Sequence, residues 1–158
     1  MRYHHATLIL AFFQLLNVVN AGDSSPSCKA SPGTSSWPSP SKWHALNSSL
    51  SGRLLQPAPP GAVCHPDQPT YDAALCPAVV TEWFTVDFFA LDPIASAWPN
   101  WNNDSCLPWL PTPCSGAAFP VYAVNATCKE DVKKGVDFAR ENNVRVVVKA
   151  TGHDYIGR

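Results

Sequence analysis

Proline limits the regular structure that most of this chain can form. The 158 residues contain 16 prolines, and nine of these fall between residues 22 and 69. Proline lacks a backbone N–H donor and fixes φ, so it interrupts helices and sheet ladders. We therefore expect residues 22–119 to form an irregular leader segment, rich in proline, serine and cysteine, that holds only short helices.

Two short helices are predicted within this leader segment. Ser41 is expected to cap the first, which runs through residue 50. Its apolar face recurs at helical spacing and consists of Trp43, Leu46 and Leu50. Residues 77–84 are expected to form the second, with Pro77 in its first turn, where proline is tolerated. Its apolar residues recur every four positions and are Leu75, Val79 and Trp83.

Residues 91–119 are rich in aromatic residues and proline, and they show no periodicity. Three tryptophans there, Trp98, Trp101 and Trp109, allow two interpretations. They could form a carbohydrate-binding platform, or they could pack under irregular loops. We favour packing, because aromatic side chains ordinarily supply buried apolar area.

The first 21 residues have the pattern of a cleaved secretory signal peptide. Arg2 precedes an apolar run over residues 6–19, and small residues stand at Val19 and Ala21. A membrane anchor is the alternative. Fourteen helical residues rise only about 21 Å, which is short of a hydrocarbon core of roughly 30 Å. We expect residues 1–21 to be removed and the protein to be secreted, extracellular and without a membrane span.

Cysteine usage agrees with an oxidising compartment, where disulfides are the usual state. Six cysteines follow the signal and allow fifteen pairings, among which sequence alone does not choose; they are Cys28, Cys64, Cys76, Cys106, Cys114 and Cys128. The pairs that lie close in sequence, Cys64/Cys76 and Cys106/Cys114, are guesses only. Because the chain has neither a CxxC pair nor a histidine-rich spacing, no metal site is expected. Glycosylation sequons begin at Asn47, Asn103 and Asn125.

Charge excludes two classes of partner. The formal net charge is -1, and no block of lysine or arginine interrupts the sequence. A binder of nucleic acid or of an anionic membrane needs a basic patch to attract phosphate groups. We therefore expect neither nucleic acid nor a membrane surface as a partner.

The last forty residues have a different pattern. Residues 120–124 and 144–148 are candidate strands, the second dominated by β-branched residues. The helix between them should begin with a capping box made by Thr127 and Glu130. Its buried stripe is expected to be Val132, Val136 and Ala139. Strand, helix and strand predict a βαβ unit with parallel strands, and the fold class is α+β.

The loop after the second strand carries the candidate binding site. Ligands in such sheets collect beyond the carboxyl ends of the strands. Gly152 and Gly157 allow backbone N–H groups to approach an anion such as a pyrophosphate. The loop lacks both the GxGxxG fingerprint and the P-loop lysine, so a nicotinamide dinucleotide and an ATPase site are both disfavoured. A lone histidine such as His153 is, on its own, more often a structural residue.

Several motifs follow one another in a fixed order along the chain. They are Tyr122-Ala123-Val124-Asn125, the helix end at residues 138–143, Thr151-Gly152-His153-Asp154-Tyr155 and Gly157-Arg158, preceded by residues 37–43, 45–47, 52–54, 71–74 and Cys76. With these motifs the chain resembles the start of the PCMH-type FAD-binding domain in the berberine-bridge-enzyme-like branch of the vanillyl-alcohol-oxidase family, in particular the secreted fungal isoamyl-alcohol-oxidase-like proteins. The upstream motifs match the leader segment of that subgroup.

The resemblance implies FAD as cofactor, bonded covalently through the ring of His153. An imidazole suits this bond because its neutral nitrogen is nucleophilic near pH 7. The loop residues expected to contact FAD are Thr151, Gly152, His153, Asp154, Tyr155 and Gly157. Asp154 is expected to orient His153 or the loop, because its charge would repel phosphate. No catalytic residue is assigned.

The resemblance further implies that residues 120–158 begin an FAD-binding domain whose remainder lies beyond this sequence. The expected function is that of an amino-terminal fragment of a secreted FAD-dependent oxidoreductase. It would oxidise alcohols or related small molecules, with dioxygen as acceptor, and the fragment alone would be inactive. The alternative is a small secreted disulfide-rich glycoprotein that binds a partner and catalyses nothing. That alternative leaves the glycine loop unexplained.

Overall fold

The computed structural model describes residues 28–96 and 98–152. The predicted signal peptide lies outside the described residues. So do four of the residues expected to contact FAD, namely His153, Asp154, Tyr155 and Gly157.

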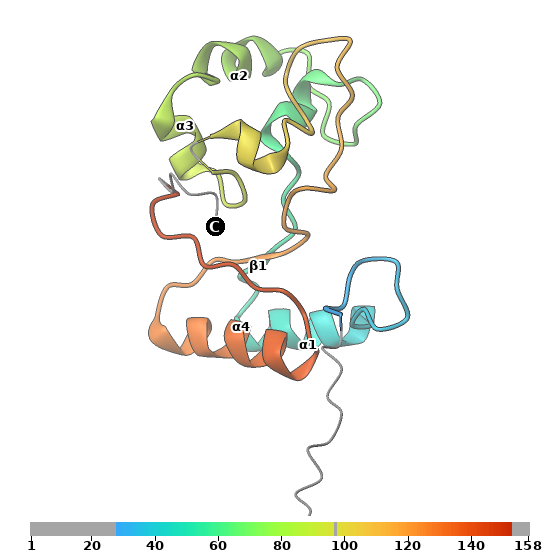
Figure 1. The fold of residues 1–158 in the computed structure, drawn as a ribbon. Coiled ribbons are helices and arrows are strands. Elements are labelled where there is room, and N and C mark those ends of the chain that lie inside the picture. Colours follow the sequence, from blue (N-terminus) through green and yellow to red (C-terminus); the bar gives the residue numbers. More distant parts are fainter. Residues whose placement is uncertain (1–27, 97, 153–158) are drawn as a thin grey trace, which may run out of the picture.

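The described chain combines short helices with one small sheet. Figure 1 shows two packed units, one above the other. The lower unit, residues 28–55 and 122–144, contains helices α1 (Pro40–Ser49) and α4 (Lys129–Glu141) and strands β1 (Leu54–Leu55) and β2 (Ala123–Val124). The upper unit, residues 56–121, contains helices α2 (Cys76–Glu82) and α3 (Val86–Leu91) and two 3-10 turns, η1 (Pro60–Cys64) and η2 (Pro99–Asn102).

The lower unit is built around the predicted face of α1. Trp43, Leu46 and Leu50 are buried there, which confirms the expected helical spacing. The ring of Trp43 stacks on the ring of Tyr122, with 4.2 Å between the ring centroids, and it contacts the ring of Phe138, with 4.6 Å between centroids. The helix begins at Pro40, one residue before the predicted cap, because proline is pre-organised for the first helical position.

The upper unit is held by two disulfides that join cysteines close in sequence. Cys64 pairs with Cys76, and Cys106 pairs with Cys114. Its apolar core consists of Trp83, Phe89 and Ala95. The helix expected over residues 77–84 is present as α2, although Leu75 from its predicted face is 55% exposed.

The two remaining cysteines, Cys28 and Cys128, are free and exposed. Cys128 precedes the first residue of α4, whereas the carbonyl of Cys28 accepts a hydrogen bond from Asn143 at the opposite end of that helix. A helix of this length spans about 20 Å. A disulfide needs Cα atoms about 4.4–6.8 Å apart, so these two cysteines do not pair with each other in this fold.

The tryptophans of residues 91–119 are less buried than expected. Trp98, Trp101 and Trp109 are 40%, 45% and 36% exposed. Trp109 packs against Trp83 and Phe84 at the edge of the upper core.

Two predictions about α4 were wrong. The residue that precedes the helix is Cys128, not Thr127, and the hydroxyl of Thr127 donates to Asp131 instead of accepting from the first turn. Of the expected buried stripe, Ala139 is buried as predicted, whereas Val132 and Val136 are 48% and 42% exposed and Asp131 is buried in their place. Asp131 forms an ion pair with Arg53, and this pairing places the Asp131 side of the helix toward the interior.

That ion pair joins α4 to the chain just before β1. The Arg53 guanidinium donates to both carboxylate oxygens of Asp131 at 2.7 Å. The backbone N–H and the hydroxyl of Thr127 also donate to this carboxylate, each at 3.1 Å. Asp131 is 1% exposed. Arg53 and these Thr127 donors hold the pKa of Asp131 far below its ordinary value of 3.8.

The sheet differs from the predicted parallel pair. β2 pairs antiparallel with β1, with Leu54 opposite Val124. Residues 145–148 form no ladder within the described part of the chain, and Val144 makes a single parallel bridge to Ala30. Val146, Val147 and Val148 are 52%, 60% and 76% exposed. β-branched side chains favour a strand only where neighbouring strands and a covered face are present.

Within residues 28–96 and 98–152, no helix combines the length and the apolar content that a membrane crossing requires.

The burial of Leu50 predicts a large effect on stability. Leu50 is 0% exposed, whereas Leu91, at the end of α3, is 85% exposed. We expect Leu50→Ala to lower the free energy of unfolding by about 2–5 kcal/mol, because it leaves a core cavity. The matched control Leu91→Ala should change it by no more than about 0.5 kcal/mol. Urea unfolding followed by tryptophan fluorescence measures both, and equal losses would contradict the assigned core.

The lowered pKa of Asp131 predicts a particular dependence of stability on pH. The carboxylate stabilises the fold fully above the pKa of the unfolded chain, about 3.9, and this contribution is lost as pH falls below it. Asp131→Asn should therefore lower the Tm by several degrees at pH 7. The difference from the unmodified chain should shrink below about pH 4. Thermal unfolding from pH 7 to pH 3 tests this, with the exposed Asp67→Asn as control. A pH-independent difference would show that the ion pair is not its source.

Candidate functional site

The described part of the predicted flavin loop consists of Thr151 and Gly152. They follow the extended residues 144–149, which cross from the lower unit to the upper unit (Figure 1). Thr151 is exposed, and Gly152 is half-buried. Gly152 has a φ of +78°, in the left-handed region that side chains other than glycine rarely adopt. The chain therefore turns sharply directly before His153.

A close approach to Lys149 explains why this turn takes a glycine. A Cβ at position 152 would lie 2.7 Å from Cε and 3.4 Å from Nζ of Lys149. It would also lie 3.8 Å from the carbonyl oxygen of Ala95. The loop therefore folds back on the stem of Lys149 and on the turn after α3.

Lys149 is held at the end of α3. Its ammonium donates to the carbonyl of Phe89 at 2.9 Å and also to the carbonyl of Asp92. Burial lowers the pKa of Lys149 from its ordinary value of 10.5, and the charge of Asp92 opposes this shift. The side chain of Asp92 accepts from the N–H groups of Ile94 and Ala95 at 2.9 and 2.8 Å, which fixes the turn.

Sequence analysis missed Lys149 because its partners lie 57 and 60 residues earlier in the chain. One signal was available. A lone lysine interrupts the apolar run directly before the glycine loop.

The described residues fit a pyrophosphate-binding loop. Gly152 supplies the turn that only glycine fills without strain, and Thr151 is an exposed residue with a hydroxyl group. Backbone N–H groups in such turns and hydroxyl groups are suitable donors to phosphate oxygens. The other four predicted contacts lie in residues 153–158, outside the described chain.

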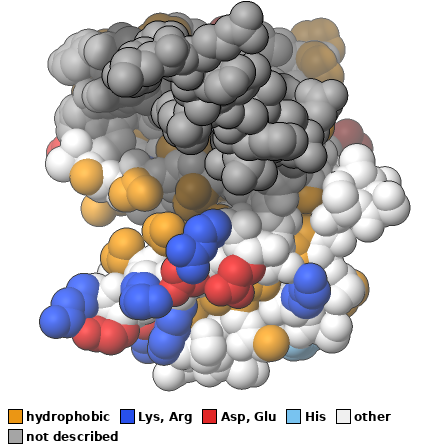
Figure 2. All heavy atoms as spheres, turned by 60° about the horizontal axis from the view of Figure 1, so that its bottom comes forward, with side chains coloured by type: hydrophobic (Ala, Val, Ile, Leu, Met, Phe, Trp, Pro, Cys, Tyr) orange, Lys and Arg blue, Asp and Glu red, His pale blue; other side chains and the backbone are white. Residues whose placement is uncertain are grey.

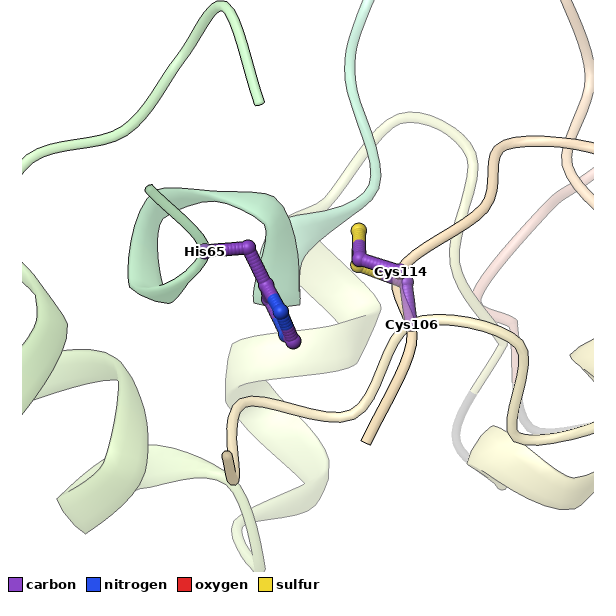
Figure 3. A group of neighbouring side chains, drawn as sticks. All are labelled: His65, Cys106 and Cys114. Carbon is purple, nitrogen blue, oxygen red and sulfur yellow. A yellow bond between two sulfur atoms is a disulfide. The ribbon is translucent and has the colours of Figure 1, made fainter. Parts of the chain in front are cut away.

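A second cluster contains residue types that often bind metals, but its atoms are not available as metal ligands. His65, which follows η1, lies beside Cys106 and Cys114 (Figure 3), and their ligand atoms are within 4.8 Å of one another. The two sulfurs are joined in a disulfide, so neither is a thiolate. Nε2 of His65 lies 2.6 Å from the carbonyl of Leu107, which can only accept, so this nitrogen carries a hydrogen. The cluster is therefore structural.

The hollows of the described chain offer no enclosed substrate pocket. The hollow beside Trp83 and Phe89 has a cavity volume of about 10 Å³, which suffices for one water molecule. An open groove runs between α1 and α4, on a face where Figure 2 shows charges of both signs intermixed. Lys42 bonds to Asn142 and Lys134 to the Ser49 carbonyl, so these two lysines already have partners within the groove.

Proteins similar to this chain are fungal FAD-linked oxidoreductases. One from Hypocrea jecorina is 41% identical over 142 residues, which span 89% of this chain and 24% of that protein. Another, from Gibberella fujikuroi, is 39% identical over 157 residues, which span 98% of this chain and 25% of that protein. The crystal structure at pH 5.0 of a VAO-type flavoprotein from Myceliophthora thermophila matches with a TM-score of 0.76 and 37% identity, over 83% of this chain and 25% of that one.

The chain thus spans about a quarter of the length of the relatives it matches. No family model matches the chain. Its homologues are fungal FAD-linked oxidoreductases that include VAO-type flavoproteins, and this bears out the resemblance drawn from the sequence motifs.

The chemistry of the His65 cluster predicts no response to zinc. A ligand that binds only the folded state raises the Tm as its concentration increases. Because the sulfurs form a disulfide and Nε2 donates to a carbonyl, we expect the Tm of the oxidised chain to be the same with excess ZnCl2 as with EDTA. Differential scanning fluorimetry measures this. Because the exposed thiols of Cys28 and Cys128 can also bind zinc, the measurement uses the Cys28→Ser/Cys128→Ser variant, in which a Tm that rises with zinc concentration would identify the cluster as a metal site.

Proposed function

We propose that this chain, a homologue of fungal FAD-linked oxidoreductases, supplies the amino-terminal part of a secreted FAD-dependent oxidoreductase of the VAO type. Identity of 39% across 98% of the chain is the observation that carries the proposal. The glycine turn at residue 152 adds support, because it suits a loop that approaches a dinucleotide.

FAD would be held by the loop that begins at Thr151. Backbone N–H groups around Gly152 and Gly157, together with the Thr151 hydroxyl, would donate to the pyrophosphate, and Tyr155 would line the same site. His153 would bond covalently to the 8α methyl carbon of the flavin through a neutral ring nitrogen, which is nucleophilic near pH 7. The new C–N bond would replace one methyl C–H bond and the ring N–H bond; the two hydrogens would reduce the flavin, and dioxygen would reoxidise it. Asp154 would orient His153 or the loop, because its charge repels phosphate.

In the whole protein, residues 120–158 would begin a PCMH-type FAD-binding domain, and residues 22–119 would form the leader segment packed against it. The exposed valines at positions 146–148 support this arrangement. They belong to an extended run that has no ladder partner within the described residues, so a further strand could pair there. In this way the run would become a strand of the predicted βαβ unit.

The activity would be oxidation of an alcohol or a related small molecule. Bound FAD supplies the acceptor for the hydride of the substrate, and dioxygen would reoxidise it. This chain contributes residues that hold the cofactor. The hollow beside Trp83 and Phe89 holds about one water molecule and the groove between α1 and α4 is open to solvent, so we expect the isolated chain to be inactive.

Secretion would follow from the signal peptide at residues 1–21. Glycans would then be carried at Asn103 and Asn125, which are exposed. Asn47 is a poorer acceptor, because its side chain is half-buried on α1 and accepts a hydrogen bond from the N–H of Leu54 at 3.0 Å.

A chimera tests the flavin site. This chain would replace the matching quarter of the Myceliophthora thermophila flavoprotein, and the purified chimera would be denatured and examined for flavin fluorescence. We expect flavin to stay with the denatured polypeptide. His153→Ala should abolish this retention, because the nucleophilic ring is lost. His44→Ala, on the exposed side of α1, should leave it unchanged.

The outcomes separate the parts of the proposal. Flavin that is present in the native chimera but released on denaturation would overturn the covalent bond and leave the FAD site in place. A folded chimera without flavin, beside a parent protein that binds it, would overturn the FAD site. That result would favour the small disulfide-rich secreted glycoprotein.

A further inference from the structure

Residues 145–148 cross from the lower unit to the upper unit, and Lys149 holds the far end of this segment by hydrogen bonds. Val144 is fixed to the lower unit, because its N–H donates to the carbonyl of Ala139 at 2.8 Å. Among the described residues, no backbone hydrogen bond joins residues 145–148 to another segment. The next position held by hydrogen bonds is Lys149, through its side chain.

Lysine suits its position at the end of α3. The last turn of a helix leaves carbonyl groups without partners, and a cation is favoured there. α3 has no basic residue in its own last turn. Lys149 provides a donor to the carbonyl of Phe89, in this last turn, and to the carbonyl of Asp92, the residue that follows the helix.

The flavin loop starts from this anchor. Gly152 lies so close to Lys149 that an added Cβ would come within 2.7 Å of Cε. Because the end of this lysine is held by two hydrogen bonds, the stem cannot move away without breaking them. The path of the chain at residue 152, directly before His153, is therefore set by where Lys149 is held.

We propose that Lys149 is the positioning residue of the flavin loop, which it fixes against α3 so that His153 is held in place for its bond to the flavin. The inference rests on the proposed function for the identity of the ligand. The anchoring itself rests only on the contacts of Lys149, Gly152 and the turn after α3.

Hydrogen exchange of the full 158-residue chain tests the anchoring. The amides of Ile94 and Ala95 report on the turn, because both residues are buried and both N–H groups bond to Asp92. Lys149→Met keeps the length of the stem and removes the donor, so these two amides should exchange at least about tenfold faster, which corresponds to a loss of about 1.4 kcal/mol. Lys149→Arg should restore most of the protection.

Two controls separate anchoring from general loss of charge or added strain. Lys129→Met removes a lysine whose side chain is 92% exposed on α4, and it should leave both amides unchanged. Gly152→Ala should displace Lys149 and speed the same exchange. Gly52→Ala adds the same backbone strain, at φ +83° with no atom within 4 Å, and should have no effect on these amides. Equal exchange in Lys149→Met and Lys129→Met would overturn the anchoring.

The chimera tests the role in flavin attachment. Lys149→Met should lower the fraction of flavin that survives denaturation about tenfold, while total FAD in the native protein stays within about twofold. Lys149→Arg should recover most of the covalent fraction, which a merely structural loss of stability would not produce. An unchanged covalent fraction in Lys149→Met would overturn the positioning role. Absence of flavin from the unmodified chimera would overturn the proposed function and the flavin part of this inference, and the exchange result would still decide the anchoring.

Discussion

The buried carboxylate of Asp131 is the contact on which the lower unit depends. It lies 78 residues from its partner Arg53, and it is the point at which α4 is fixed to the chain that leads into β1. Four hydrogen bonds satisfy its oxygens, so the charge is compensated although almost no water reaches it. This contact sets the rotation of α4. The rotation decides which residues face Trp43, where the helix meets β2 at Gly135, and where the chain leaves at Val144.

Local sequence patterns predicted the elements better than their contacts. The apolar face of α1 was correct, because Trp43, Leu46 and Leu50 are close in sequence and their burial needs only a helix. The stripe of α4 was correct at Ala139 but wrong at Val132 and Val136, because apolar periodicity carries no information about an aspartate that pairs with a distant arginine. The parallel pairing of residues 144–148 was likewise inferred from composition, whereas pairing depends on which strands are present. Sequence alone could not choose among fifteen cysteine pairings, and the two pairs guessed from their closeness in sequence are the ones that the fold forms.

The sequence proposed a candidate loop, and the structure adds what holds the start of that loop in place. Glycine at position 152 and the motif after it marked the loop, and the positive φ at Gly152 agrees with the reason given for that glycine. The motif carries no information about which residues hold the loop in place. Lys149 reaches α3, and the nearer of its two bonding partners is 57 residues away, so no local pattern reveals it. His65 shows the converse case, since a suggestive group of metal-binding residue types becomes structural once the sulfurs are joined.

The antiparallel pairing of β1 with β2 also gives the molecule a nested topology. The chain leaves the lower unit after β1 and returns to it before β2. Because these two strands are neighbours, residues 56–121 form an insertion whose two ends lie side by side. Both disulfides lie inside that insert and neither crosses its boundary. Reduction would therefore loosen the insert while leaving the register of the host unit intact.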